Sequence, residues 1–159
     1  MSRLRSTILG LGAGALVAGA VALSAQAQGS DNPAVTARQS LMRLYAFNIG
    51  TLGAMAKGNM PYDAEAAAAA ARNLAALSHL NGKAMWPAGT DNASIEGTHA
   101  LPAIWEDFAG FAAKGQALQA ATEAMAEAAP KGLESLQGAM GPLGAACGGC
   151  HKVYRASMK

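Results

Sequence analysis

Two cysteines three residues apart are followed directly by a histidine, in the run Cys147-Gly-Gly-Cys150-His151. They are the only cysteines in the 159-residue chain. On a helix these three side chains share one face. Two thiols at this spacing can add to the two vinyl groups of one porphyrin, and the adjacent imidazole can then bind the iron. The motif therefore predicts one covalently attached haem c, with Cys147 and Cys150 as thioether links and His151 as the proximal iron ligand.

Two other uses of the motif stay open. A thioredoxin-like redox pair needs a preceding strand and a sheet, and the sequence predicts neither. A zinc site needs four ligands, so His79 or His99 would have to join the motif without the spacing of a zinc finger. The chain shows no Ser/His/Asp set and no carboxylate pair suited to acid–base chemistry. An enzyme is therefore not predicted.

The composition favours helices that would position this motif. With 52% hydrophobic, 14% charged and 5% aromatic residues, the chain is too apolar to be disordered and poorly suited to a strand-rich core. Proline and glycine separate four helical stretches, and residues 83–101 form one long irregular segment that we expect to cover something. Residues 28–159 are thus predicted to form an all-α, antiparallel up-down-up-down four-helix bundle. The predicted helices span 33–57, 63–80, 102–129 and 133 to the end, the last bent at Gly141-Pro142.

Residues 1–27 read as a secretory signal peptide. Arg3 and Arg5 precede an uncharged run over 8–23, and Ala25-Gln26-Ala27 supplies the small-x-small pattern that signal peptidase recognises. The run is short for a membrane span, so we expect cleavage after Ala27, no span in the mature chain and, in a bacterium, a periplasmic location. Removing two arginines from the twelve basic residues leaves as many basic as acidic groups, so nucleic-acid binding is not predicted.

Several segments in order give the chain a resemblance to the class II c-type cytochromes, the cytochrome c′ family. That family carries its haem motif at the C-terminal end of a four-helix bundle. The resemblance implies a periplasmic carrier of single electrons with redox proteins as partners, or a protein that binds NO or CO. It also implies a possible homodimer through the first two helices, with Tyr45, Phe47 and Leu52 as candidate surface residues. The matching segments are Arg38-Gln39-Ser40-Leu41-Met42, residues 57–63, 87–90 and 102–105, and Cys147 to Arg155.

The resemblance also assigns residues around the haem. Arg38 lies on the apolar stripe of the first helix, where a cation needs an anionic partner, and the haem propionates would supply one. The other residues assigned are Gln39, Thr98 and His99 at the haem edge, Trp86 as a wall of the distal pocket, and Arg155 beside the proximal imidazole.

Met42 matches the family position over the distal face of the iron. In one branch of the family a methionine at this position binds a low-spin iron, and in the other the residue packs over a high-spin iron without binding it. A thioether is a competent sixth ligand and would raise the redox potential. We favour Met42 as this ligand, which predicts the electron carrier; an open sixth site predicts the gas-binding protein.

Overall fold

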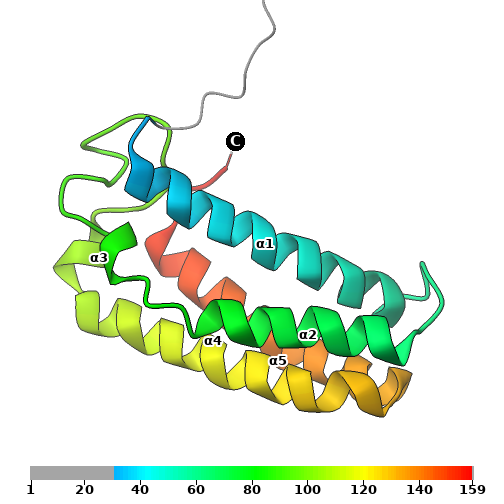
Figure 1. The fold of residues 1–159 in the computed structure, drawn as a ribbon. Helices are drawn as coiled ribbons and strands as arrows, with labels where there is room; N and C mark the ends of the chain where they lie inside the picture. The colour runs from blue at the N-terminus through cyan, green and yellow to red at the C-terminus, as the bar shows by residue number, and fades with distance from the viewer. Residues whose placement is uncertain (1–30, 159) are drawn as a thin grey trace, which may run out of the picture.

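The computed structural model describes residues 31–158 (Figure 1). The predicted signal peptide, residues 1–27, lies outside this range. Across the range that is described, none of the helices combines the length and the apolar character needed to cross a membrane.

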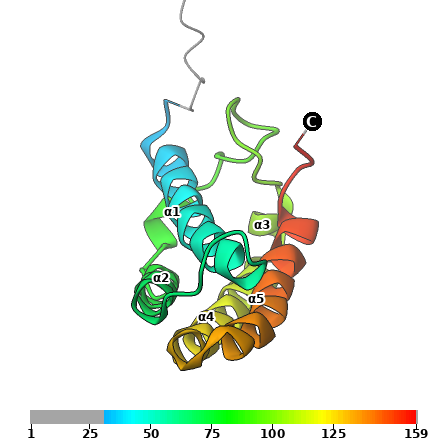
Figure 2. The same cartoon turned by 90° about the vertical axis from the view of Figure 1, so that its right-hand side faces the viewer.

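Four long helices alternate in direction along the chain, which confirms the predicted all-α, up-down-up-down bundle (Figure 1; Figure 2). Two of them begin where the sequence places good caps. The Asn32 side chain accepts hydrogen bonds from the first turn of α1, and Asp63 Oδ1 accepts one from the Ala66 amide at 2.7 Å in α2. The long helices are α1 (Pro33–Ala56), α2 (Ala64–Ser78), α4 (Phe108–Ala128) and α5 (Leu133–Tyr154); the short ones are η1 (Lys83–Met85), α3 (Ala103–Glu106) and η2 (Ala129–Lys131).

The main core runs along the bundle axis and is built from large apolar side chains on all four long helices, with alanines added on α2. The alanine-rich face of α2 buries Ala67, Ala70 and Ala71, and these small side chains let α1 and α4 pack closely on either side. The large, fully buried core side chains are Leu52, Met55, Leu74, Met125, Leu136 and Leu143.

The prediction of one continuous third helix over 102–129 is wrong. α3 ends at Glu106, and Asp107 takes a non-helical conformation (φ −131°, ψ 65°) before α4 begins at Phe108. Asp107 Oδ1 accepts a hydrogen bond from the Gly110 amide at 2.9 Å, so this aspartate caps a new helix in the middle of the predicted one. The apolar pattern on either side of Asp107 hid this break. By contrast, α5 continues through Pro142 as a single helix.

The long connection between α2 and α3 folds over the end of the bundle that carries the start of α1 and the end of α5 (Figure 1). It is irregular apart from the short helix η1, as the sequence predicts. Its last part pairs with the chain after α5: the Leu101 amide donates to the Tyr154 carbonyl at 3.0 Å, and the Ala156 amide donates to the His99 carbonyl at 2.8 Å. The connection therefore holds the end of the helix that carries the Cys-x-x-Cys-His motif.

Candidate haem site

The position of Met140 relative to Gly53 shows how α1 and α5 face one another. A β-carbon at Gly53 would lie 3.7 Å from the Met140 Cε atom. Residues three and four apart share one side of a helix. The side of α1 that faces α5 at Gly53 therefore continues through Ile49 and Ala46 to Met42, near the N-terminal end of the helix.

The corresponding side of α5 leads to the motif. From Met140 it continues through Gly144 and Cys147 to His151. α1 and α5 are antiparallel, so the C-terminal end of α5, which carries the motif, lies at the same end of the bundle as the N-terminal end of α1, which carries Met42. The two helices diverge in this direction and are the least tightly packed pair of neighbouring long helices (Figure 2). Met42 and His151 therefore lie on facing sides of the two helices at the diverging end.

Both cysteines and the histidine are half-buried, and the two thiols are free. Burial raises the pKa of Cys147 and of Cys150, so both are neutral thiols near neutral pH. Cys147 lies close to Tyr45 of α1: burial, and then the charge of the Cys147 thiolate, raise the pKa of Tyr45 to about 12. Cys150 packs against a second, smaller core of Ala100, Ile104 and Tyr154.

The His151 imidazole is in the protonation state that a metal ligand needs. Burial, and then the positive charge of Arg155, lower the pKa of His151 below its usual value of 6.5. The ring is therefore mostly neutral at pH 7, with a lone pair free to bind iron. Arg155 is exposed and follows the end of α5 in an extended conformation, near enough to His151 for its charge to act on the imidazole.

Arg38 is the centre of a hydrogen-bond network that ties the long connection to α1. Its side chain is only 4% exposed. Nη1 donates to the Met85 carbonyl at 3.1 Å and to Thr90 Oγ1 at 2.8 Å. Nη2 donates to the Thr90 carbonyl and to Thr98 Oγ1, the latter at 2.8 Å. The guanidinium also stands 4.8 Å from the centroid of the Trp86 ring, in a cation–π contact.

The described residues give Arg38 no ion pair, and its hydrogen-bond partners among them are neutral carbonyl and hydroxyl oxygens. Burial lowers the pKa of Arg38, and the nearby charge of Asp91 partly offsets this. A guanidinium has five donors, so these charge-assisted hydrogen bonds leave the predicted pairing with the haem propionates as a prediction.

The other residues predicted around the haem differ in whether their side chains contact the long connection or α1. Gln39 Nε2 donates to the Gly97 carbonyl at 2.7 Å, so Gln39 joins Arg38, Thr98 and Trp86 in holding the long connection. The His99 side chain is exposed, and the residue takes part through its backbone carbonyl. The structure therefore brings four of the five residues together around α1 and leaves the His99 ring outside.

The two alternative uses of the motif lack their structural context. Between residues 31 and 158, no three His, Cys, Asp or Glu side chains come together in an arrangement that could hold a metal ion, so the zinc site does not form. Over the same range the only strand-like pairing is the isolated bridge between Ala100 and Arg155. The sheet on which a thioredoxin-like pair would sit is therefore missing from that range.

Sequence reasoning missed three contributors near the motif: Thr90, Asp107 and Tyr45. The hydroxyl and carbonyl oxygens of Thr90 accept from Arg38, and the Thr90 hydroxyl donates to the Pro87 carbonyl at 2.8 Å. No sequence pattern identifies such a partner, because the contact joins residues 52 positions apart. Asp107 could have been found from the sequence, because aspartate is a favoured residue at the start of a helix. Tyr45 lies on the apolar stripe of α1, so the sequence indicates that it is buried. The sequence does not indicate that its neighbour is the Cys147 thiol.

The residues on the facing sides of α1 and α5 suit a flat, covalently held group. Ala46 of α1 and Gly144 of α5 are small and exposed. The two half-buried thiols and the neutral imidazole belong to α5, and Met42 belongs to α1. Thiol, imidazole and thioether groups are the set that attaches and ligates a haem c.

Known proteins are similar to this chain over most of its length. The family described as Cytochrome C' matches residues 33–155. The chain is 47% identical over 121 residues to cytochrome c-554 of Cereibacter sphaeroides, which covers 76% of this chain and 79% of that protein. The solved structure of cytochrome c' from Rhodobacter sphaeroides superposes with a TM-score of 0.77 at 41% identity, covering 79% of this chain and 96% of the other. A nitric oxide complex of a leucine-to-alanine variant of cytochrome c prime from Alcaligenes xylosoxidans superposes with a TM-score of 0.69 at 37% identity, covering 78% and 94%. The chain belongs to the cytochrome c′ family and, like its members, carries one covalently attached haem c.

Proposed function

We propose that this protein is a single-electron carrier in which Cys147 and Cys150 attach the haem and His151 and Met42 ligate its iron. Helical spacing supports the proposal, because it puts Met42 of α1 and His151 of α5 at the same end of this pair of helices. Met42 is 42% exposed although it lies beside the buried stripe of α1, so its thioether is not used by the protein core. When bound, the haem supplies the redox chemistry, with its iron changing between ferric and ferrous states.

Hydrogen bonds between α1 and the long connection support this function, because they would control access to the haem edge. We propose that Arg38, Gln39 and Thr98 hold the connection closed over that edge, with Arg38 also providing the positive charge nearest the propionates. Trp86 packs edge-on against Phe111, with ring centroids 4.7 Å apart, and would thereby wall the pocket. A closed edge would limit the access of water to the iron and so protect its ligands from exchange.

The alternative function is the binding of NO or CO at an open sixth site. A specific observation favours it: one structural relative, at 37% identity, is a nitric oxide complex. In this alternative Met42 packs over the distal face and does not bind the iron. The two functions differ in spin state, because a bound methionine gives a six-coordinate low-spin iron.

The absorption spectrum of the ferric protein tests this choice. A low-spin spectrum with a methionine-to-iron charge-transfer band supports the electron carrier with Met42 bound. A high-spin spectrum at neutral pH, together with ready binding of CO to the ferrous protein, would overturn it in favour of the gas-binding function.

The predicted export and partners complete the proposal. The leader at residues 1–27 supports a periplasmic location, where other redox proteins would exchange electrons with the haem. Mass spectrometry of exported protein should show loss of residues 1–27 and the gain of one haem. A membrane fraction that retains Met1 would contradict the cleavage.

We also propose that the protein forms a homodimer through α1 and α2. Of the three candidate surface residues, Tyr45 and Leu52 are buried in the core, whereas Phe47 is 74% exposed. Leu44 of α1 and Leu80, just after α2, are also exposed, and they border a surface groove of about 300 Å³ between these helices. Exposed large apolar side chains gathered along two neighbouring helices are typical of a protein–protein interface.

A further inference from the structure

The last residue of α5 is tied to the start of α4 by a side-chain hydrogen bond that the haem chemistry does not use. Tyr154 is 5% exposed, and its hydroxyl donates to Asp107 Oδ2 at 3.1 Å. The other carboxylate oxygen, Oδ1, accepts from the Gly110 amide at 2.9 Å. One carboxylate therefore both begins α4 and holds the end of α5.

The absence of a side chain at Gly110 makes this arrangement possible. A β-carbon there would overlap Asp107 Oδ2 and would lie 2.7 Å from the Tyr154 hydroxyl oxygen. Neither neighbour is a flexible end with free space around it, because each is held by the other. Position 110 is thus restricted to glycine by the Asp107–Tyr154 pair, although its backbone is helical.

Tyr154 is fixed from two further directions. Its ring meets the Phe111 ring edge-on, with centroids 5.4 Å apart. Its carbonyl accepts from the Leu101 amide at 3.0 Å. A terminal helical residue with its hydroxyl, ring and carbonyl all engaged is uncommon, because helix ends ordinarily fray.

The turn that Tyr154 closes is the one that carries His151. Tyr154 follows His151 by three residues, and the Arg155 amide donates to the His151 carbonyl at 3.2 Å in the final hydrogen bond of the helix. Any rotation or fraying at Tyr154 would be transmitted through this single turn to the imidazole.

We propose that Asp107 and Tyr154 are positioning residues for the proximal ligand: their hydrogen bond fixes the last turn of α5, and with it the angle at which the His151 imidazole meets the iron. This inference rests on the proposed role of His151. Groups that orient a metal-binding histidine influence its strength as a ligand, even though they never touch the metal. Here the orienting group acts through the backbone of the ligand's own helical turn.

Two substitutions separate this role from simple packing. Tyr154→Phe removes the hydroxyl and keeps the ring against Phe111. Asp107→Ser keeps a good helix cap for α4, because serine caps about as well as aspartate, and removes the second oxygen that Tyr154 needs. The matched control is Tyr62→Phe, since the Tyr62 hydroxyl donates to the Ala129 carbonyl at 2.8 Å away from the motif.

The measurements are made on the ferric holoprotein. The proton NMR shifts of the haem methyl groups report the orientation of the axial imidazole, and amide hydrogen exchange reports the opening of residues 151–156. We expect both test variants to change the pattern of methyl shifts in the same way and to speed this exchange by about tenfold, as expected for loss of one hydrogen bond. Tyr62→Phe should change neither. The double variant should resemble each single one, because both break the same contact.

Wild-type methyl shifts and wild-type exchange in Tyr154→Phe would overturn the positioning role. Faster exchange with unchanged methyl shifts would also overturn it, since the pair would then be structural only. His151→Gly tests the underlying assignment separately: if its ferric spectrum matches wild type, His151 is not the ligand, whatever the tyrosine variant shows.

Discussion

Gly53 of α1 faces the end of the Met140 side chain on α5, because a β-carbon at position 53 would lie 3.7 Å from Met140 Cε. Beyond this point the two helices separate toward the start of α1 and the end of α5 (Figure 2). The 3.7 Å distance is ordinary van der Waals contact, so alanine would fit at position 53, whereas a longer side chain would have to displace Met140.

The first prediction concerns Met42→Ala. If Met42 is the sixth ligand, the variant should become high-spin, lose the charge-transfer band, bind CO readily and show a lower redox potential, because the thioether favours ferrous iron. Absorption spectroscopy and potentiometry measure these changes. The matched control is Met60→Ala, another partly exposed methionine, which should leave all of them as in wild type. A wild-type protein that is already high-spin would remove the basis for this prediction.

The second prediction concerns the thioether links. Replacing either Cys147 or Cys150 by serine should leave one covalent bond, and replacing both should leave a chain from which haem is extracted by acidified organic solvent. We expect the double variant to be less helical and to melt at a lower temperature, because the space between α1 and α5 would lose its largest apolar occupant. Mass spectrometry and circular dichroism test this. A double variant as helical and heat-stable as the holoprotein would show that the haem does not complete the core.

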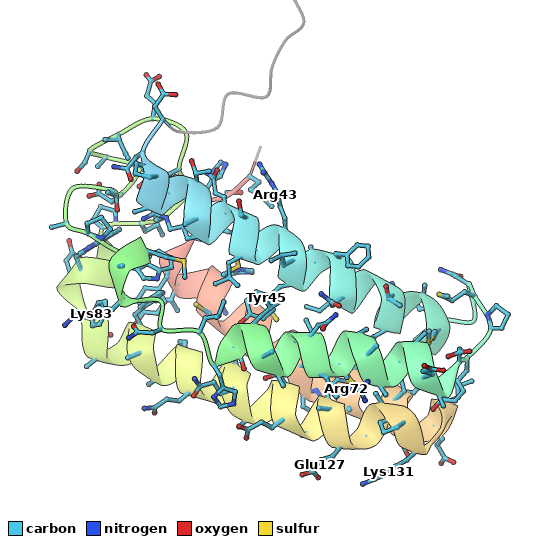
Figure 3. All side chains as sticks on the ribbon, viewed as in Figure 1. Arg43, Tyr45, Arg72, Lys83, Glu127 and Lys131 are labelled. Atoms are coloured by element: carbon cyan, nitrogen blue, oxygen red, sulfur yellow. The ribbon has the colours of Figure 1, made fainter. Side chains whose placement is uncertain are left out.

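The third prediction concerns Arg38→Leu. Removing the guanidinium leaves the oxygens of Thr90 and Thr98 without their donor, so we expect a loss of about 3 kcal/mol in the free energy of unfolding. Arg38→Lys should recover little of it, because one ammonium cannot replace a forked guanidinium. The control is Arg43→Leu, since Arg43 points away from the bundle (Figure 3) and should matter by less than about 0.5 kcal/mol. Denaturant unfolding measures the free energy of unfolding of these three variants. Equal losses for Arg38→Leu and Arg43→Leu would show that the Arg38 hydrogen bonds do not stabilise the fold.

The fourth prediction concerns the homodimer. Phe47→Asp places a charge on the exposed side of α1 and should convert a dimer to a monomer without changing the absorption spectrum. Leu133→Asp, at an exposed apolar residue at the start of α5, is the control and should leave the association unchanged. Sedimentation analysis distinguishes the two. A wild-type protein that is monomeric at micromolar concentration would contradict the proposed interface.

The parts of the fold that could be predicted are those whose sequence signals lie close together along the chain. Caps such as Asp63 and the apolar stripe of α1 lie within one or two helical turns, so they can be read without the structure. The break at Asp107 is also local, but the apolar residues on both sides conceal it. The orientation of α1 against α5 is not local, because it depends on where two helices distant in sequence happen to touch.

The same distinction applies to the site. The Cys147 to His151 motif identifies the haem by itself, because its spacing matches a chemical requirement. The partners of Arg38 could not be predicted: the sequence shows a cation on an apolar stripe and therefore demands compensation, but an anion and a set of neutral oxygens satisfy that demand equally well. The neutral partners at Thr90 depend on the path of the connection, which no local sequence pattern shows.

The hydrogen bonds at the motif end of the bundle have a consequence for the order of folding. Arg38 reaches partners 47 to 60 residues away, and Tyr154 reaches Asp107 across 47 residues. Contacts of such long sequence separation form late, after neighbouring helices such as α1 and α2, or α4 and α5, have paired. We therefore expect folding to pass through an intermediate in which the helices are already paired while the connection between α2 and α3 is still open. The end of α5 that carries the Cys147 to His151 motif would then be the last part of the bundle to be fixed.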